Sequence, residues 1–221
     1  YVYSADTVRD RYRALRGAFT RPVLVCYALK ANSSKAVASV LAREGAGADI
    51  VSGGELYRAL QVGIEPQRIV FAGVGKSAGE IRYALESNIL MFNVESSAEL
   101  RAIDRVAGEM KTRARVALRI NPDIDPKTHP YISTGLKKSK FGIAADRALE
   151  EFTVASSLAN IDVVGVHKHI GSQLTEVTPF VAAVKKVVTL VGALKAQGIN
   201  IQYVNIGGGL GIIYNKEKPQ T

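Results

Sequence analysis

Short apolar runs rich in β-branched residues alternate with longer amphipathic stretches along the whole chain, and this alternation limits the possible folds more than any other feature. Several of the runs are apolar on both faces, as in parallel strands that helices cover. Seven runs are expected to be strands: Pro22–Leu29, Ala48–Val51, Ile69–Phe71, Leu90–Val94, Arg115–Ile120, Val163–Ile170 and Ile201–Ile206. The stretches between them predict helices over residues 33–44, 53–62, 77–87, 96–110, 145–158 and 178–197.

Such alternation predicts an α/β protein with a parallel sheet and right-handed crossovers, either open and doubly wound or closed into a barrel. Seven strand runs with one helix per step favour the TIM-type (β/α)8 barrel. A complete barrel takes roughly 250 residues, and this chain has 221. We therefore expect one barrel domain over residues 1–221 that stops before its last strand. The start at Tyr1-Val2-Tyr3 is typical of a strand interior and suggests a trimmed N-terminus.

Helix starts and one long loop complete this expected layout. Ser33, Ser52, Ser77 and Thr178 stand at or next to the expected helix starts, where a hydroxyl group can cap free backbone N–H groups. The irregular segment 121–143 separates the fifth strand run from its helix. In a barrel it would be a loop at the C-terminal face, where active sites lie.

Charge and composition bound the partners. The net charge is +9, but the basic residues are mostly scattered. The densest cluster, Lys137, Lys138 and Lys140, has no interleaved aromatic residues that could stack on bases. We therefore expect the excess charge to be solvated surface, or an uneven share of a longer chain, rather than a nucleic-acid site. No membrane partner is expected, and no apolar run approaches the roughly 20 residues that span a bilayer. One cysteine, Cys26, cannot form an internal disulfide, which favours the cytoplasm.

Lys30 follows the first strand run and is a candidate reactive amine. Alternation along a strand puts Cys26, Ala28 and Lys30 on one face. Apolar walls would disfavour the ammonium form, lower the pKa of Lys30 and suit the amine to Schiff-base chemistry. A lysine whose amine reaches the surface fits the spacing equally well. Cys26 is expected to be core rather than a nucleophile.

Two histidines lie two residues apart near the end of the sixth strand run. His167 and His169 share a face of that run, but no third ligand has a clear spacing, so no metal site is expected. Ring stacking or proton handling suits His169 better. Ser172 lies in the loop that follows and can offer N–H and hydroxyl groups to a phosphate. His129, in the long irregular segment, is expected to be exposed.

Three consecutive glycines, Gly207, Gly208 and Gly209, follow the seventh strand run. Without a Cβ atom, they let backbone N–H groups approach an anion, and the corresponding loop of a barrel is a common phosphate site. A tight turn is the alternative. Asp49, Glu55 and Arg119 are polar side chains at or just beyond strand ends. With Lys30, His169 and the glycines, they are expected to ring one end of the barrel.

Five segments together resemble a known family. They are Tyr27–Asn32, Val166–Gln173, Asn205–Gly211 and the pair 129–135 and 139–142. The first three are similar to the cofactor attachment, histidine and phosphate segments of the barrel-type (fold-type III, alanine racemase-like) pyridoxal phosphate-dependent decarboxylases of basic amino acids. The last pair is similar to the diaminopimelate decarboxylase branch. The resemblance spans essentially the whole chain, in the right order.

The resemblance implies a cofactor, pyridoxal 5′-phosphate, and roles for the candidate residues. Lys30 and His169 would be catalytic: Lys30 would hold the cofactor as an internal aldimine, and His169 would stack on the pyridine ring. Ser172 and the three glycines would bind its phosphate. The remaining polar residues would surround the ring and Lys30: Asp49, Glu55 and Arg119.

The resemblance also implies a reaction, the decarboxylation of the small amino acid meso-diaminopimelate to L-lysine and carbon dioxide at the end of lysine biosynthesis. It implies a homodimer and a C-terminal β-domain beyond this chain, so that the 221 residues alone would show little turnover. A decarboxylase of ornithine, arginine or carboxynorspermidine is the near alternative. A non-catalytic cofactor-binding module and a nucleic-acid binder are the others. Lys168 departs from the pattern: it should face the helix layer, and we expect its amine to reach solvent along the side chain.

Overall fold

The computed structural model describes residues 1–124 and 141–219 and divides the chain into two compact units. They are called here the N-terminal unit, Tyr1–Phe92, and the C-terminal unit, Asn93–Thr221, and each is described by itself. In both units parallel strands alternate with helices. The predicted α/β class, with the strand–helix succession of a TIM-type barrel, is therefore confirmed.

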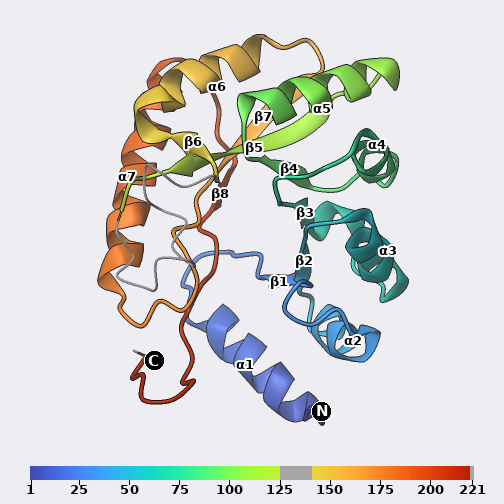
Figure 1. Cartoon of the computed structure of the whole chain (residues 1–221), viewed down its shortest axis with the longest axis vertical. Helices are drawn as coiled ribbons and strands as arrows, with labels where there is room; N and C mark the ends of the chain where they lie inside the picture. Colours follow the sequence, from blue (N-terminus) through green and yellow to red (C-terminus); the bar gives the residue numbers. More distant parts are fainter. Residues whose placement is uncertain (125–140, 220–221) are drawn as a thin grey trace. The chain divides into compact units, whose positions relative to one another are not determined.

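In the N-terminal unit the helices α2 (Lys35–Arg43), α3 (Gly53–Gln61) and α4 (Ala78–Glu86) lie along one side of the strands (Figure 1). Strands β1 to β4 pair in chain order, and every pair is parallel. Asp49 is registered with Ala28 on one side and Val70 on the other, so the carboxyl ends of these strands meet at one edge. Its elements are α1 (Ala5–Gly17), β1 (Cys26–Ala28), α2 (Lys35–Arg43), β2 (Gly47–Ile50), α3 (Gly53–Gln61), the 3-10 turn Pro66–Arg68, β3 (Ile69–Phe71), α4 (Ala78–Glu86) and the first half of β4 (Met91–Val94).

The C-terminal unit repeats the same plan, with two longer strands, β5 and β7. β7 lies between β5 and β8, all parallel, and β6 pairs with the end of β5. Figure 1 shows α6 and α7, which are in contact, flanking these strands. Its elements are α5 (Ser97–Glu109), β5 (Ala114–Asn121), β6 (Ile143–Ala144), the 3-10 turn Ala145–Arg147, α6 (Ala148–Ser157), β7 (Ile161–His167), α7 (Thr178–Ala196) and β8 (Tyr203–Asn205).

Apolar strands form the core of each unit. In the N-terminal unit Ile50, Ile69 and Phe71 are fully buried, and the rings of Phe71 and Phe92 stack with centroids 6.1 Å apart. In the C-terminal unit the fully buried Leu118 and Phe152 lie on β5 and α6. Burial on both faces explains why these strands are continuously apolar in sequence, as parallel strands between helices are.

Serine–glutamate pairs begin three of the helices. Ser77 Oγ accepts from the Glu80 N–H at 3.3 Å while the Glu80 carboxylate accepts from the Ser77 N–H at 3.0 Å, a complete capping box. Ser52 caps α3, and Ser96 caps α5. Two of the four expected caps are wrong. Ser33 instead accepts from the Arg58 guanidinium, and Thr178 is the first residue inside α7, without a cap bond.

All six predicted helices and all seven strand runs have a counterpart, with three corrections at the ends. Tyr1–Tyr3 is not a strand but precedes the helix α1, which the sequence analysis missed. Ser4 caps α1, whose buried Tyr12 packs on Leu41. β6 was missed because it has only two residues. β7 ends at His167, so His169 lies beyond the strand rather than on it.

Candidate functional site

Lys30 lies in a turn just past the end of β1 and is exposed. The turn is closed by the Ala31 N–H, which donates to the Ala28 carbonyl at 3.1 Å, and by the Tyr27 hydroxyl, which donates to the Asn32 carbonyl at 3.0 Å. Strand alternation does not extend to Lys30, because β1 ends at Ala28. The expectation that apolar walls enclose the amine is therefore wrong for the described chain.

Asp49 lies on β2, directly opposite Ala28 of β1, and so near the turn that carries Lys30. It is half-buried, and its charge acts on Cys26, two residues before Ala28. Burial, with a smaller contribution from Asp49, raises the pKa of the Cys26 thiol to about 12. A thiol with that pKa stays protonated at neutral pH and is a poor nucleophile. This agrees with the prediction that Cys26 is a core residue.

Glu55 lies in the first turn of α3, where its carboxylate is engaged with the main chain. Oε2 accepts from the Val51 N–H at 2.8 Å, and the Glu55 N–H donates to Ser52 Oγ at 3.2 Å. These bonds hold the turn between β2 and α3. Both hydrogen bonds thus serve the local structure, and the predicted position of Glu55 near the cofactor ring stays a prediction.

Arg119, near the end of β5, is the centre of a buried polar group in the C-terminal unit. Its Nη1 donates to Glu95 Oε1 at 2.8 Å and to Oε2 at 3.0 Å. Its Nη2 donates to the carbonyl oxygen of His169 at 3.3 Å. The guanidinium carbon lies 4.9 Å from the ring centroid of Phe141, within cation–π range. The structure therefore brings together two of the predicted residues, Arg119 and His169.

The glycine turn after β8 packs directly on the His169 segment. The Gly208 N–H donates to His169 Nδ1 at 3.4 Å, which leaves the proton of a neutral ring on Nε2. Gly209 has φ +106°, and a Cβ atom there would overlap the carbonyl oxygen of Gly171. A Cβ on Gly207 would lie 2.5 Å from the Lys168 carbonyl oxygen, whereas one on Gly208 would meet no atom within 4 Å.

Main-chain bonds join the loops that follow β7 and β8. The Leu174 N–H donates to the Gly209 carbonyl at 2.9 Å, and the Gly211 N–H donates to the Leu174 carbonyl at 2.8 Å. Ser172, on the first of these loops, is exposed. Ser172 and the three glycines are thus held on neighbouring backbone segments, as a shared anion site requires.

Lys168, whose neighbours in sequence are His167 and His169, is buried, with 1% of its surface exposed. Its Nζ has no hydrogen-bond partner in the described part of the chain and lies 5.0 Å from the ring centroid of Phe180 on α7. Burial lowers the pKa of its amine to about 8. The side chain does face the helix layer, but the expectation that its amine reaches solvent is wrong.

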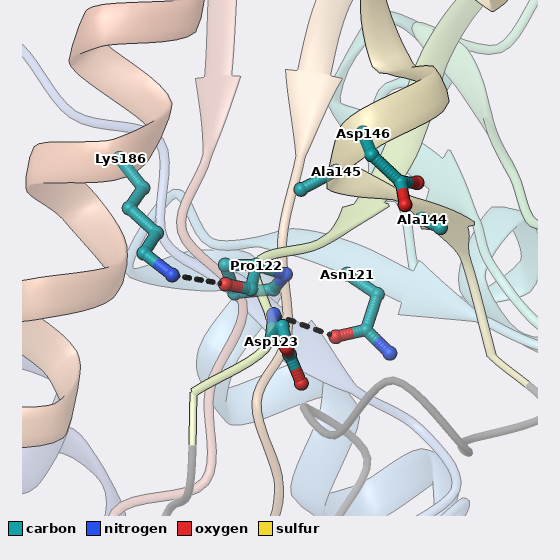
Figure 2. Close-up of a pocket in the computed structure, with 7 residues that line it drawn as sticks. All are labelled: Asn121, Pro122, Asp123, Ala144, Ala145, Asp146 and Lys186. Carbon is teal, nitrogen blue, oxygen red and sulfur yellow. Dashed lines mark hydrogen bonds between the residues drawn. The ribbon is translucent and has the colours of Figure 1, made fainter.

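A pocket of about 290 Å³ lies at the ends of β5 and β6, beside α7 (Figure 2). Lys186 Nζ donates to the Pro122 carbonyl at 2.7 Å across it. Two carboxylates, of Asp123 and Asp146, are in its lining. No predicted site residue lines this pocket, so its position does not coincide with the strand-end residues described above.

Some predicted features lie outside the described residues. They are His129, the segment 129–135, residues 139 and 140 of the segment 139–142, and the cluster of Lys137, Lys138 and Lys140. Over residues 1–124 and 141–219, no group of three potential metal ligands is found, and no helix is long and apolar enough to cross a membrane.

Residues 5–221 match the family described as "Pyridoxal-dependent decarboxylase, pyridoxal binding domain". The chain belongs to this family. It is 52% identical over 217 residues to the diaminopimelate decarboxylase of Aquifex aeolicus, covering 98% of this chain and 51% of that protein. It is 50% identical over 220 residues to the enzyme of Vibrio cholerae, covering 99% and 53%. This pyridoxal-binding domain thus spans about half the length of the curated relatives it matches.

Solved structures agree with this family membership. Diaminopimelate decarboxylase from Helicobacter pylori, complexed with L-lysine, superposes on this pyridoxal-binding domain with a TM-score of 0.96 and 48% identity, covering 99% of this chain and 56% of that chain. The enzyme from M. jannaschii, also with L-lysine, gives a TM-score of 0.86 at 45% identity, covering 97% and 51%.

Sequence reasoning missed Glu95, the ion-pair partner of Arg119. Glu95 directly follows the apolar run that became β4, and a carboxylate at that place was a usable signal. Its partner lies 24 residues away, and no helix or strand period relates positions that far apart. The pairing is a product of the fold and could not be read from spacing.

Proposed function

We propose that this domain is the cofactor-binding part of a diaminopimelate decarboxylase, which releases carbon dioxide from meso-diaminopimelate and forms L-lysine. The observation that carries the proposal is the 50% identity over 220 residues with a curated enzyme of that name. The matched 220 residues include the lysine, histidine and glycine segments. The comparison structure that contains L-lysine agrees with a product of this chemistry.

The described residues fit pyridoxal 5′-phosphate. The glycine turn is exposed at Gly207 and Gly208, and the space where a Cβ of Gly208 would lie is open. A phosphate can approach the main chain there, because positive-φ glycines turn N–H groups outward as an anion-binding concavity. Ser172, exposed on the adjoining loop, can add its hydroxyl group.

The cofactor, when bound, supplies an electron sink for the electrons left behind by the departing carbon dioxide. Lys30 would attach the cofactor through its amine, since Lys30 is exposed just past the end of β1. His169 would lie against the ring, with its orientation set by the Gly208 N–H. Asp49 would place a negative charge close to the Lys30 turn.

The proposal also covers the pathway, the compartment and the assembly of the protein. The domain acts in lysine biosynthesis, in the cytoplasm, as one barrel domain of a homodimer whose C-terminal β-domain completes the substrate site. The unpaired Cys26 is compatible with a reducing compartment. The homodimer and the β-domain are supported by the motif resemblance, and light scattering of the full-length protein tests the dimer.

The near alternative, a decarboxylase of a shorter or different basic amino acid, is less well supported. A lysine/ornithine decarboxylase from Vibrio vulnificus, complexed with putrescine, matches at a TM-score of 0.81 but only 25% identity. Curated diaminopimelate decarboxylases match at about twice that identity.

Borohydride trapping tests the attachment residue. The full-length protein is incubated with pyridoxal 5′-phosphate, reduced and mapped by peptide mass spectrometry. We expect a phosphopyridoxyl group on Lys30, loss of that adduct in Lys30→Arg, and retention in the control Lys35→Arg, whose lysine is the first residue of α2. L-Lysine should form from meso-diaminopimelate in the wild type. An adduct elsewhere refutes the role of Lys30, and turnover of ornithine or arginine in place of diaminopimelate supports the alternative.

A further inference from the structure

The ion pair between Glu95 and Arg119 has no role in the function proposed above. The two side chains are only 2% and 7% exposed. Separating a buried pair is costly, because either charge would be left uncompensated in a medium of low dielectric constant. Both carboxylate oxygens of Glu95 accept from the same guanidinium nitrogen, at 2.8 and 3.0 Å. The position of the guanidinium group is therefore firmly set by Glu95.

Glu95 is itself held by the start of a helix. Its N–H donates to the Glu99 carboxylate at 3.0 Å, and the next residue, Ser96, caps α5 by accepting from the Glu99 N–H at 3.2 Å. Two bonds thus fix the main chain at Glu95 to the first turn of α5. Because its main chain is anchored, the Glu95 carboxylate can fix the orientation of Arg119, and such outer contacts affect how tightly a ligand is bound.

Arg119 connects Glu95 to the His169 segment by a hydrogen bond. Its second terminal nitrogen donates to the His169 carbonyl at 3.3 Å, and Phe141 covers the guanidinium face. The His169 ring in turn accepts from the Gly208 N–H at 3.4 Å. A continuous chain of contacts therefore leads from Glu95 to the glycine turn.

We propose that Glu95 is a positioning residue: through Arg119 it fixes the main chain at His169 and, with it, the ring of His169 and the turn at Gly207–Gly209. The proposal rests on the proposed function, in which that ring and that turn hold the pyridine ring and the phosphate of one ligand. Arg119 then acts by orienting His169 rather than by contacting the ligand.

A purely stabilising ion pair makes a different prediction. Loss of such a pair lowers the free energy of unfolding and speeds hydrogen exchange wherever exchange requires global unfolding. Loss of a positioning contact speeds exchange at the segments it holds, because these then open locally. The two roles are therefore distinguished by where the exchange rates change.

Hydrogen exchange followed by mass spectrometry tests the proposal in the full-length protein without added cofactor. The variant is Glu95→Gln, which keeps the shape of the side chain and removes its charge. The matched control is Glu151→Gln: Glu151 is 3% exposed, pairs with Arg147 and accepts from Ser97 Oγ at 2.7 Å. None of its hydrogen bonds or ion pairs described here involves His169.

We expect Glu95→Gln to speed exchange about tenfold at residues 168–172 and 207–211, as loss of a charged hydrogen bond would. Glu151→Gln should leave both segments unchanged. Unchanged exchange there in Glu95→Gln, or a uniform increase over the whole chain, would overturn the proposal. If Glu95→Gln does not fold, Glu95→Asp takes its place, because it keeps the charge and shortens its reach by one methylene.

Equilibrium dialysis with pyridoxal 5′-phosphate gives the second readout. Glu95→Gln should bind it on the order of tenfold more weakly than wild type, and Glu151→Gln equally well. Unweakened binding in a variant with fast local exchange would refute the link between positioning and the ligand. If the wild type binds no cofactor, the proposed function fails, and the exchange data still decide whether Glu95 positions His169.

Discussion

Carboxylates next to strand ends serve different purposes in the two units. In the N-terminal unit, Glu55 and Glu80 accept main-chain N–H groups and hold the turns between strand and helix. In the C-terminal unit, Glu99 has the same task at the start of α5, but Glu95 pairs with a buried arginine, which reaches the main chain of a predicted site residue. The place of a polar residue in a strand–helix repeat is therefore weak evidence of function. Its partners are what distinguish a cap from a site.

A substitution in the glycine turn of the C-terminal unit is expected to have the largest effect, because there is no room for a Cβ atom at Gly209. Gly209→Ala would force a Cβ into the Gly171 carbonyl at a φ of +106°. We expect it to lower the free energy of unfolding by about 3 kcal/mol. Urea unfolding measures this.

Gly208→Ala is the matched control, since a Cβ there meets nothing within 4 Å. It should cost less than about 1 kcal/mol. If the two variants lost the same free energy of unfolding, the turn would not be packed against the loop after β7 at Gly209.

Lys168 tests how much the burial of an amine lowers the free energy of unfolding when the amine has no hydrogen-bond partner among the described residues. The buried Arg119 of the same unit, by contrast, is paired with Glu95. Lys168→Met should raise the free energy of unfolding at pH 7 by about 2 kcal/mol, because a buried amine is replaced by an apolar side chain of similar length. The exposed Lys185 of α7 supplies the control variant Lys185→Met, which should change little.

The pH dependence follows from the lowered pKa of Lys168. Between about 8 and the ordinary 10.5, the unfolded chain binds one more proton than the folded chain. Wild-type stability attributable to Lys168 should therefore rise with pH across this window, by up to about 3 kcal/mol, and stay flat below it. Urea unfolding at pH 7 and pH 9.5 measures the rise. Lys168→Met should lack it, and an equal rise in that variant would assign it to other groups.

Glu80 gives the smallest expected effect and tests the capping side of the comparison. Its bond from the Gly53 N–H, followed by that from Ser77, lowers the pKa of the carboxyl group. Glu80→Gln should reduce the free energy of unfolding by about 1 kcal/mol at pH 7. The difference from wild type should disappear as acid titrates Glu80 through its lowered pKa.

The exposed Glu86, the last residue of α4, provides the control Glu86→Gln. Thermal or urea unfolding at pH 7 and pH 3 compares the variants. If Glu80→Gln were to weaken cofactor binding as Glu95→Gln is expected to, the distinction between capping and positioning carboxylates would not hold.

Local patterns predicted much of this fold. Ile69–Phe71 was placed to the residue, and the helices that became α3, α4 and α5 were placed within one or two residues, because apolar periodicity and caps are local properties. The helix α1 was missed although Ser4, Val8 and Tyr12 carry its signal, because only one narrow side of it is buried.

The site was predicted as residues but not as contacts. His169 and the glycines could be named from their order along the chain, whereas the Arg119 bridge to Glu95 and His169 depends on which strands become neighbours. The spacing left an enclosed and an exposed Lys30 equally open, and the end of β1 at Ala28 decides for the exposed one. For Lys168, alternation correctly placed the side chain toward the helix layer, but whether its amine reaches solvent depends on the packing of α7.

The paired bonds between Leu174 and the chain at Gly209 and Gly211 continue the parallel pairing of β7 and β8 past both strand ends, and Leu174 and Leu210 form a bridge there. The glycine turn is thus an ordered extension of the sheet. An anion that binds it meets a preorganised surface and costs little conformational entropy. Phosphate binding should then show a small entropic penalty in calorimetry.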